Sequence, residues 1–87
     1  MRLVPSTRFK KHYRKLSRAL QTRADERLAL FAEDPFHSLL NNHQLHGKHR
    51  DNWSINVGGD YRIVYREIES SVYLLIDIGT HHELYGS

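Results

Sequence analysis

The sequence contains no cysteine, which excludes a disulfide framework, a thiol nucleophile and every cysteine-based zinc or iron–sulfur site. It also lacks any apolar run near the ~20 residues of a membrane helix, and Met1 to Pro5 is not followed by the apolar core of a signal peptide. At 87 residues we expect one domain over 1–87, with a thin core and a shallow active site. We also expect a reducing, cytoplasmic location without membrane contact.

Acidic residues are absent from the first 23 positions, which hold eight of the 13 lysines and arginines. The net formal charge is only +3, so this basic block is local, and six of the seven histidines lie beyond it. Such a block indicates a polyanion nearby, either nucleic acid or an acidic partner protein, and it is equally typical of a solvated helix face.

The N-terminal stretch predicts a strand over 2–5 followed by an amphipathic helix. Pro5 cannot donate to a strand ladder and ends the strand, and Ser6 or Thr7 can cap the helix. Apolar residues then follow at the period of one helical face, namely Phe9, Tyr13, Leu16 and Leu20. The outer face is basic and is a candidate RNA-binding surface made of Lys10, Lys11, Arg14, Lys15 and Arg18.

A second helix is predicted to begin at Thr22 and to end at Asp34-Pro35. Asp25 and Glu26 would stand in its first turn, where the helix dipole favours acids. Its inward residues would be Ala24, Leu28 and Phe31. Residues 36–47 show no sustained period and predict a packed loop, anchored by Leu39, Leu40 and Leu45.

The C-terminal half alternates with the period of strands. Residues 53–57 and 61–65 flank a Gly58-Gly59-Asp60 turn and predict a hairpin with Ile63 and Tyr65 inward. The apolar run 72–78 predicts a central strand, and 80–83 fits a capping box for one last helical turn. We therefore predict an α+β fold: a short N-terminal strand, two α-helices on a mainly antiparallel sheet of about four strands, and a short C-terminal helical turn.

Four segments accompany this order of elements: Leu45-His46-Gly47, the strand Trp53-Ser54-Ile55-Asn56-Val57, the segment Gly59-Asp60-Tyr61-Arg62-Ile63-Val64-Tyr65, and the ending Ile78-Gly79-Thr80-His81-His82-Glu83-Leu84-Tyr85-Gly86. Together they resemble the RelE/ParE superfamily of bacterial type II toxins, and the ending is most similar to the YafQ branch. The resemblance implies a small endoribonuclease that needs no metal or other cofactor, cuts mRNA on the ribosome, and is silenced by a cognate antitoxin protein. The ParE branch shares the fold but poisons DNA gyrase.

The resemblance also implies site residues, which are His43 before Leu-x-Gly, Asp60 and Tyr61 after the hairpin turn, Arg62 as a phosphate ligand, His81 after Gly-Thr, and Tyr85 four residues later. One position departs from the pattern, because Asn56 stands where relatives carry a histidine or a lysine. This difference removes a possible proton donor.

The chemistry of RNA cleavage needs these residue types. RNA supplies its own nucleophile, the 2′-hydroxyl, so cleavage needs a base, an acid for the leaving 5′-oxygen and positive charge on the phosphate. We assign the acid to His81, the base to Asp60 or His43 with the two histidine roles exchangeable, the phosphate charge to Arg62 and base stacking to Tyr85. His46 and Lys48 are further RNA-binding candidates. Histidines at 43, 46 and 49 are a weak metal signal, so we predict no metal site.

Structural roles compete with these assignments. Asp60 could cap backbone N–H groups of the turn, and Arg62 could pair across strands with Glu67 or Asp77. Tyr85 could close the edge of the core. Three functions remain open: an RNase, a gyrase-type binding toxin, and an inactive relative that binds antitoxin or RNA. An RNase requires the candidate side chains to converge on one phosphate-sized site.

Overall fold

The fold is built on a five-stranded sheet with the strand order β1-β5-β4-β3-β2. The computed structural model describes residues 1–86. The strands are β1 (Arg2–Pro5), β2 (His43–Gln44), β3 (Trp53–Gly58), β4 (Tyr61–Glu69) and β5 (Val72–Thr80). Strand β1 runs parallel to β5, and the other neighbours are antiparallel. The predicted α+β class is confirmed, whereas the sheet has one strand more than expected.

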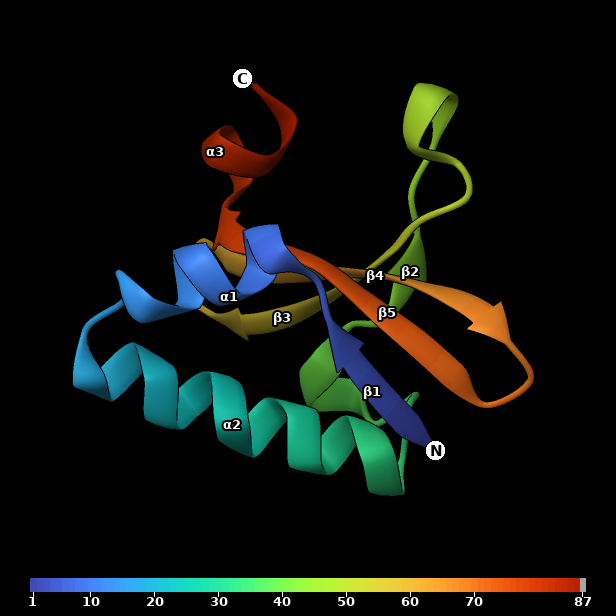
Figure 1. The fold of residues 1–87 in the computed structure, drawn as a ribbon, viewed down its shortest axis with the longest axis horizontal. Coiled ribbons are helices and arrows are strands. Elements are labelled where there is room, and N and C mark those ends of the chain that lie inside the picture. The colour runs from blue at the N-terminus through green and yellow to red at the C-terminus, as the bar shows by residue number, and fades with distance from the viewer. Residues whose placement is uncertain (87) are drawn as a thin grey trace.

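The helices lie on both sides of this sheet (Figure 1). They are α1 (Thr7–Arg14), α2 (Arg18–Glu33) and α3 (His81–Tyr85), with 3₁₀ turns η1 (Ser38–Leu40) and η2 (Gly47–His49). Helix α2 runs along one face, whereas α3 and the segment between β2 and β3 rise on the opposite side (Figure 1). Among the helices of residues 1–86, none has the length and hydropathy needed to cross a membrane.

The boundary between α1 and α2 lies earlier than the sequence indicated. Helix α1 ends in a 3₁₀-type turn. In it the amides of Lys15 and Leu16 donate hydrogen bonds to the carbonyls three residues earlier, at 3.2 and 3.1 Å. The Ser17 hydroxyl then accepts the amide of Leu20 at 3.2 Å and caps α2. The predicted start at Thr22 is therefore wrong, and neither Asp25 nor Glu26 stands in the first turn of α2.

The core lies between α2 and the sheet and extends to α1. Its buried residues are Phe9, Ala24, Phe31, Leu40, Ile55, Val57, Ile63, Tyr65, Leu75 and Ile78. The Phe31 ring meets those of Tyr65 and Tyr73 edge-on, with centroids at 4.8 and 5.5 Å. The inward direction of Ile63 and Tyr65 is confirmed. Leu40 anchors the loop after α2, whereas Leu39, predicted as a second anchor, is 57% exposed.

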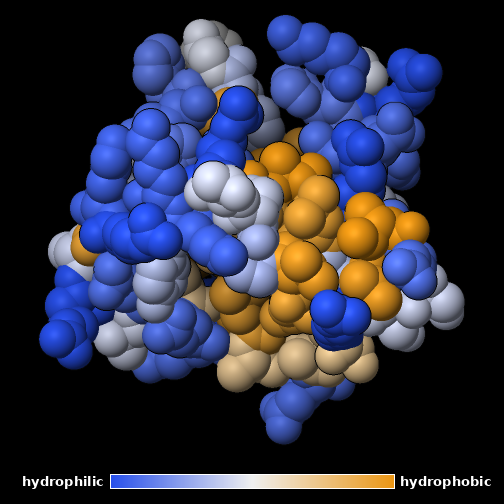
Figure 2. All heavy atoms as spheres, in the orientation of Figure 1, coloured by the Kyte–Doolittle hydropathy of each residue, from blue (hydrophilic) through white to orange (hydrophobic). Residues whose placement is uncertain are grey.

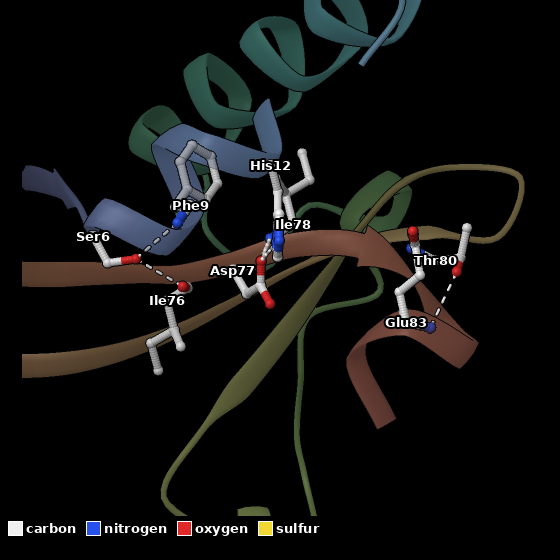
Figure 3. Close-up of polar contacts among 8 residues, drawn as sticks. All are labelled: Ser6, Phe9, His12, Ile76, Asp77, Ile78, Thr80 and Glu83. Carbon is white, nitrogen blue, oxygen red and sulfur yellow. Dashed lines mark hydrogen bonds and ion pairs between the residues drawn. The ribbon is translucent and has the colours of Figure 1, made fainter. Parts of the chain in front are cut away.

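Where β1 ends, Ser6 and helix α1 continue the contacts with the edge of β5. The amide of Ser6 donates to the Leu75 carbonyl at 2.9 Å, and its hydroxyl donates to the Ile76 carbonyl at 2.7 Å. Farther along α1, His12 Nδ1 lies 2.6 Å from Asp77 Oδ1 (Figure 3). These contacts fix the second half of β5, which leads directly into α3.

Candidate active site

A cavity of about 410 Å³ opens on the side of the sheet opposite α2. We call it the basic cavity, and its lining residues are Asn41, His43, Leu45, His46, Lys48, His49, Ser54, Arg62, His81 and Tyr85. The segment around η2 forms one wall and α3 the other. Ser54 and Arg62 reach it because strand alternation points them away from Ile55 and Ile63. Within residues 1–86 the lining contains four histidines, a lysine and an arginine but no carboxylate.

Arg62 lies on β4 beside Asn56 of β3. Its Nη1 donates to the carbonyls of Gly59 and Tyr61, both at 3.0 Å. These bonds fix the guanidinium at the hairpin turn, and Nε and Nη2 carry three further N–H groups that can bind an anion. The competing prediction that Arg62 pairs with Glu67 or Asp77 is wrong, because Arg62 binds these carbonyls and Asp77 binds His12 instead.

His81 is the first residue of α3, and its backbone is held on two sides. Its amide donates to the Asp60 carbonyl at 3.1 Å. The predicted capping box is present: the Thr80 hydroxyl accepts the Glu83 amide at 3.2 Å, and the Glu83 carboxylate accepts the Thr80 amide at 2.8 Å (Figure 3). Hydrogen bonds with Thr80, chiefly from its backbone, hold the pKa of Glu83 below its usual value.

Tyr85 connects the two walls of the basic cavity. Its ring meets that of His81 edge-on at a centroid distance of 4.6 Å and that of His49 at 6.0 Å. Its hydroxyl is buried and has no hydrogen-bond partner within residues 1–86. Tyr85 therefore positions two imidazoles, and its predicted stacking on a base stays a prediction.

The hydrogen bonding of His43 fixes its tautomer. Nδ1 lies 2.8 Å from the Asn41 carbonyl oxygen, and because a carbonyl only accepts, Nδ1 carries the proton. In the neutral ring Nε2 is then the free acceptor, which suits a general base. His46 and Lys48, the other RNA-binding candidates of this segment, also line the basic cavity, and their contact with RNA stays a prediction. Across residues 1–86, no group of three or more His, Asp or Glu is arranged to hold a metal ion.

Ser54 is a lining residue that the sequence did not reveal. It is 1% exposed, and its hydroxyl has no partner within residues 1–86. The available signal was its place in β3, where it shares a side with Asn56 and alternates with Ile55.

Other predicted site residues lie outside the basic cavity. Asp60 is exposed at the hairpin turn and contributes its carbonyl rather than its carboxylate. Asn56 does not line the cavity, and its side-chain oxygen is buried without a partner in the described chain. The basic residues of the N-terminal helices form a separate exposed surface, made of Lys10, Lys11, Arg14, Lys15 and Arg18.

Solved structures share this fold at low sequence identity. YafQ from E. coli strain BL21(DE3) is 16% identical with a TM-score of 0.82, and the match covers 99% of this chain and all (100%) of that one. A YoeB/ParE toxin from Agrobacterium tumefaciens is 20% identical with a TM-score of 0.78, over 93% of this chain and 99% of that one. The E. coli DinJ-YafQ toxin-antitoxin complex matches at 17% identity with a TM-score of 0.79, and the match covers 97% of this chain and 96% of the chain in that complex.

No protein among the curated sequences matches the chain. A family model does match, described as the bacterial toxin of type II toxin-antitoxin systems, YafQ, and it spans residues 1–86. The order of elements agrees with the resemblance seen in the sequence. The chain therefore belongs to the YafQ family of type II toxins.

Proposed function

We propose that this toxin is an endoribonuclease that cleaves mRNA on the ribosome and thereby inhibits translation. The observation that carries the proposal is the basic cavity, in which His43, Arg62 and His81 share one space without a carboxylate. Such a lining suits a phosphodiester, because every ionisable group that can become charged at neutral pH is basic.

The proposed reaction uses the 2′-hydroxyl of the RNA as its nucleophile. Nε2 of His43 takes the 2′-hydroxyl proton as the 2′-oxygen bonds to phosphorus. The bond from phosphorus to the 5′-oxygen breaks, and protonated His81 gives its proton to that oxygen. The products are a 2′,3′-cyclic phosphate and a free 5′-hydroxyl.

Positive charge stabilises the phosphorane between these two proton transfers. The bonds of Nη1 to the turn hold the Arg62 guanidinium in place. Its Nε and Nη2 can then donate two parallel hydrogen bonds to phosphate oxygens. Lys48 adds charge from the η2 wall.

The base role goes to His43 rather than to Asp60. The Asp60 side chain is exposed and outside the basic cavity, whereas its carbonyl holds the amide of His81. Asp60 thus helps to position His81, because its carbonyl binds the first residue of α3. Asn56, which replaces the possible proton donor of relatives, does not line the cavity, so the proposed proton transfers do not use this position.

The proposed protein partner is a cognate antitoxin. This part rests on the family membership and on the fold shared with the toxin of the DinJ-YafQ complex. We place the chain in the cytoplasm, where ribosomes and mRNA are found.

The decisive experiment uses ribosomes loaded with an mRNA that carries one 2′-deoxynucleotide at the cleavage site. The protein is expected to cut the all-ribose mRNA to a 2′,3′-cyclic phosphate and to leave the substituted position intact. A 3′-hydroxyl product, or cleavage at the deoxynucleotide, would contradict the mechanism. A protein that cuts no RNA and stalls DNA gyrase would replace the proposal with the gyrase function.

A further inference from the structure

A smaller pocket adjoins the basic cavity and shares Leu45, His49 and Tyr85 with it. We call it the side pocket. Its volume is about 130 Å³, and its lining is completed by Arg8, Asn52, Val64, Ile76, Asp77 and Leu84. Figure 2 shows apolar side chains between two hydrophilic flanks, one over α1 and α3 and the other over the segment between β2 and β3. A ligand in the basic cavity can therefore extend into the side pocket.

The walls of the side pocket suit one flat ring. Leu45, Val64, Ile76 and Leu84 supply apolar surface from four different parts of the fold. An apolar cavity of about 150 Å³ in another protein holds a benzene ring, so the side pocket matches a single six-membered ring in size. Every nucleobase contains such a ring, and it carries the groups that distinguish the bases.

Asp77 is the one acid that lines either the basic cavity or the side pocket within residues 1–86. Its side chain is 15% exposed. Oδ1 lies 2.6 Å from His12 Nδ1 and accepts the Ile78 amide at 2.8 Å. The other oxygen points away from His12 and α1 (Figure 3). Since a carboxylate repels phosphate, this oxygen suits an N–H donor on a ligand that is otherwise anionic.

We infer that the side pocket holds the nucleobase next to the scissile phosphate, and that Asp77 selects adenine or cytosine there. This inference rests on the proposed RNA cleavage. Adenine and cytosine carry an exocyclic amino donor where guanine and uracil carry a carbonyl oxygen. The free oxygen of Asp77 accepts a hydrogen bond from the amino group and repels the carbonyl. His12 is a positioning residue that orients the carboxylate.

The direct test follows the methyl groups of Val64, Ile76 and Leu84 by NMR during titration with the four nucleoside 5′-monophosphates. AMP and CMP are expected to shift these methyls and to bind at least tenfold more tightly than GMP and UMP. In Asp77→Asn, whose carbonyl can still accept from His12 and Ile78, the preference is expected to fall by about 10-fold to 100-fold. Asp51→Asn removes the same charge from an exposed residue and is expected to keep the parental preference.

Equal binding of all four nucleotides, or shifts confined to the basic cavity, would overturn the inference. A parallel assay of cleavage on ribosomes separates it from the proposed function. If the parent cuts RNA and Asp77→Asn leaves the base preference beside the cut unchanged, the base pocket is wrong and the RNase stands. If the parent cuts no RNA but binds AMP and CMP at these methyls, the RNase proposal falls together with the place beside a scissile phosphate, whereas the selection of a base by Asp77 stands.

Discussion

Buried polar atoms without a partner concentrate at the basic cavity. Within residues 1–86 they are Ser54 Oγ, Asn56 Oδ1 and the Tyr85 hydroxyl. Ser54 and Tyr85 line the cavity, and Asn56 lies on the same side of β3. Leaving such a group without a hydrogen bond costs about 1–3 kcal/mol of stability. The free toxin is therefore less stable at its site than an apolar lining would make it, as functional sites often are.

Removing the Ser54 hydroxyl is expected to stabilise the free protein. Ser54→Ala deletes a buried hydroxyl that has no hydrogen-bond partner among residues 1–86, so the free energy of unfolding should rise by about 1 kcal/mol. The matched control is Ser6→Ala, which loses the hydrogen bonds to Ile76 and Phe9. It should lower the free energy of unfolding by about 1–2 kcal/mol. Urea unfolding measures both variants, and equal destabilisation by the two would contradict the account.

The buried hydroxyl of Tyr65 predicts a loss of stability at high pH. Burial raises its pKa to about 12 from an ordinary 10.0, although the hydrogen bond to Asn42 opposes the shift. Between pH 10 and pH 12 the unfolded chain loses this proton and the folded protein keeps it, so stability falls as pH rises. Tyr65→Phe should remove this part of the decline in urea midpoints. A parallel decline in both proteins would show that Tyr65 is not its source.

Helix α3 is too short to be stable alone, since isolated helices under ~12 residues are marginal. Its position depends on the capping box and on the bond from the His81 amide to the Asp60 carbonyl. The order of the α3 backbone thus decides where His81 and Tyr85 lie.

Acid is expected to loosen α3 before the sheet. The pKa of Glu83 is lowered, so its carboxylate stabilises the fold above the ordinary value of 4.5, and this contribution is lost as pH falls through the lowered value. Hydrogen exchange of the amides of 81–85 should then accelerate while those of β4 stay protected. Glu83→Gln should show fast exchange at neutral pH and a weaker pH dependence. Equal acceleration in α3 and β4 would mean global unfolding instead.

Local patterns in the sequence predicted most of these elements. The period-two segments became β3 and β4, and residues 80–83 formed the capping box. The break at Ser17 was missed because the apolar spacing of α1 continues without interruption into α2. Strand β2 has only two residues, too few to show a period, and exists through its pairing with β3.

Part of the site could be predicted from motifs and part could not. His43, Arg62, His81 and Tyr85 lie in the basic cavity as their motifs indicated. Asp60 does not, because it lies exposed in the hairpin turn, after a register shift between Asn56 and Gly58 at the end of β3. The side pocket is lined by residues that are distant in the sequence, and its Asp77 is oriented by His12, which lies 65 positions earlier. No local pattern reveals such a contact.

The molecule has two separate basic surfaces. The basic cavity holds the groups assigned to chemistry, whereas the basic side chains of α1 are exposed outside it. Exposed lysines and arginines attract a polyanion over long distances without fixing its position. We therefore expect α1 to control association and the cavity to control cleavage.

Charge reversal of α1 tests this division. Changing Lys10, Lys11, Arg14 and Lys15 together to Glu should weaken ribosome binding and flatten its salt dependence, because fewer counterions are released. His81→Ala serves as the control and should keep the parental salt slope. An unchanged slope in the fourfold variant would remove α1 from the RNA surface, and loss of antitoxin binding alone would assign α1 to the antitoxin.

The most direct test of the central claim compares His81→Ala with His82→Ala. Both histidines lie on α3, but only His81 lines the basic cavity. Removing a positioned acid or base typically costs about 100-fold to 10,000-fold in rate. Cleavage of ribosome-bound mRNA should fall by that factor in His81→Ala and stay parental in His82→Ala, with antitoxin binding kept in both. A folded His81→Ala protein that cleaves at the parental rate would contradict the account.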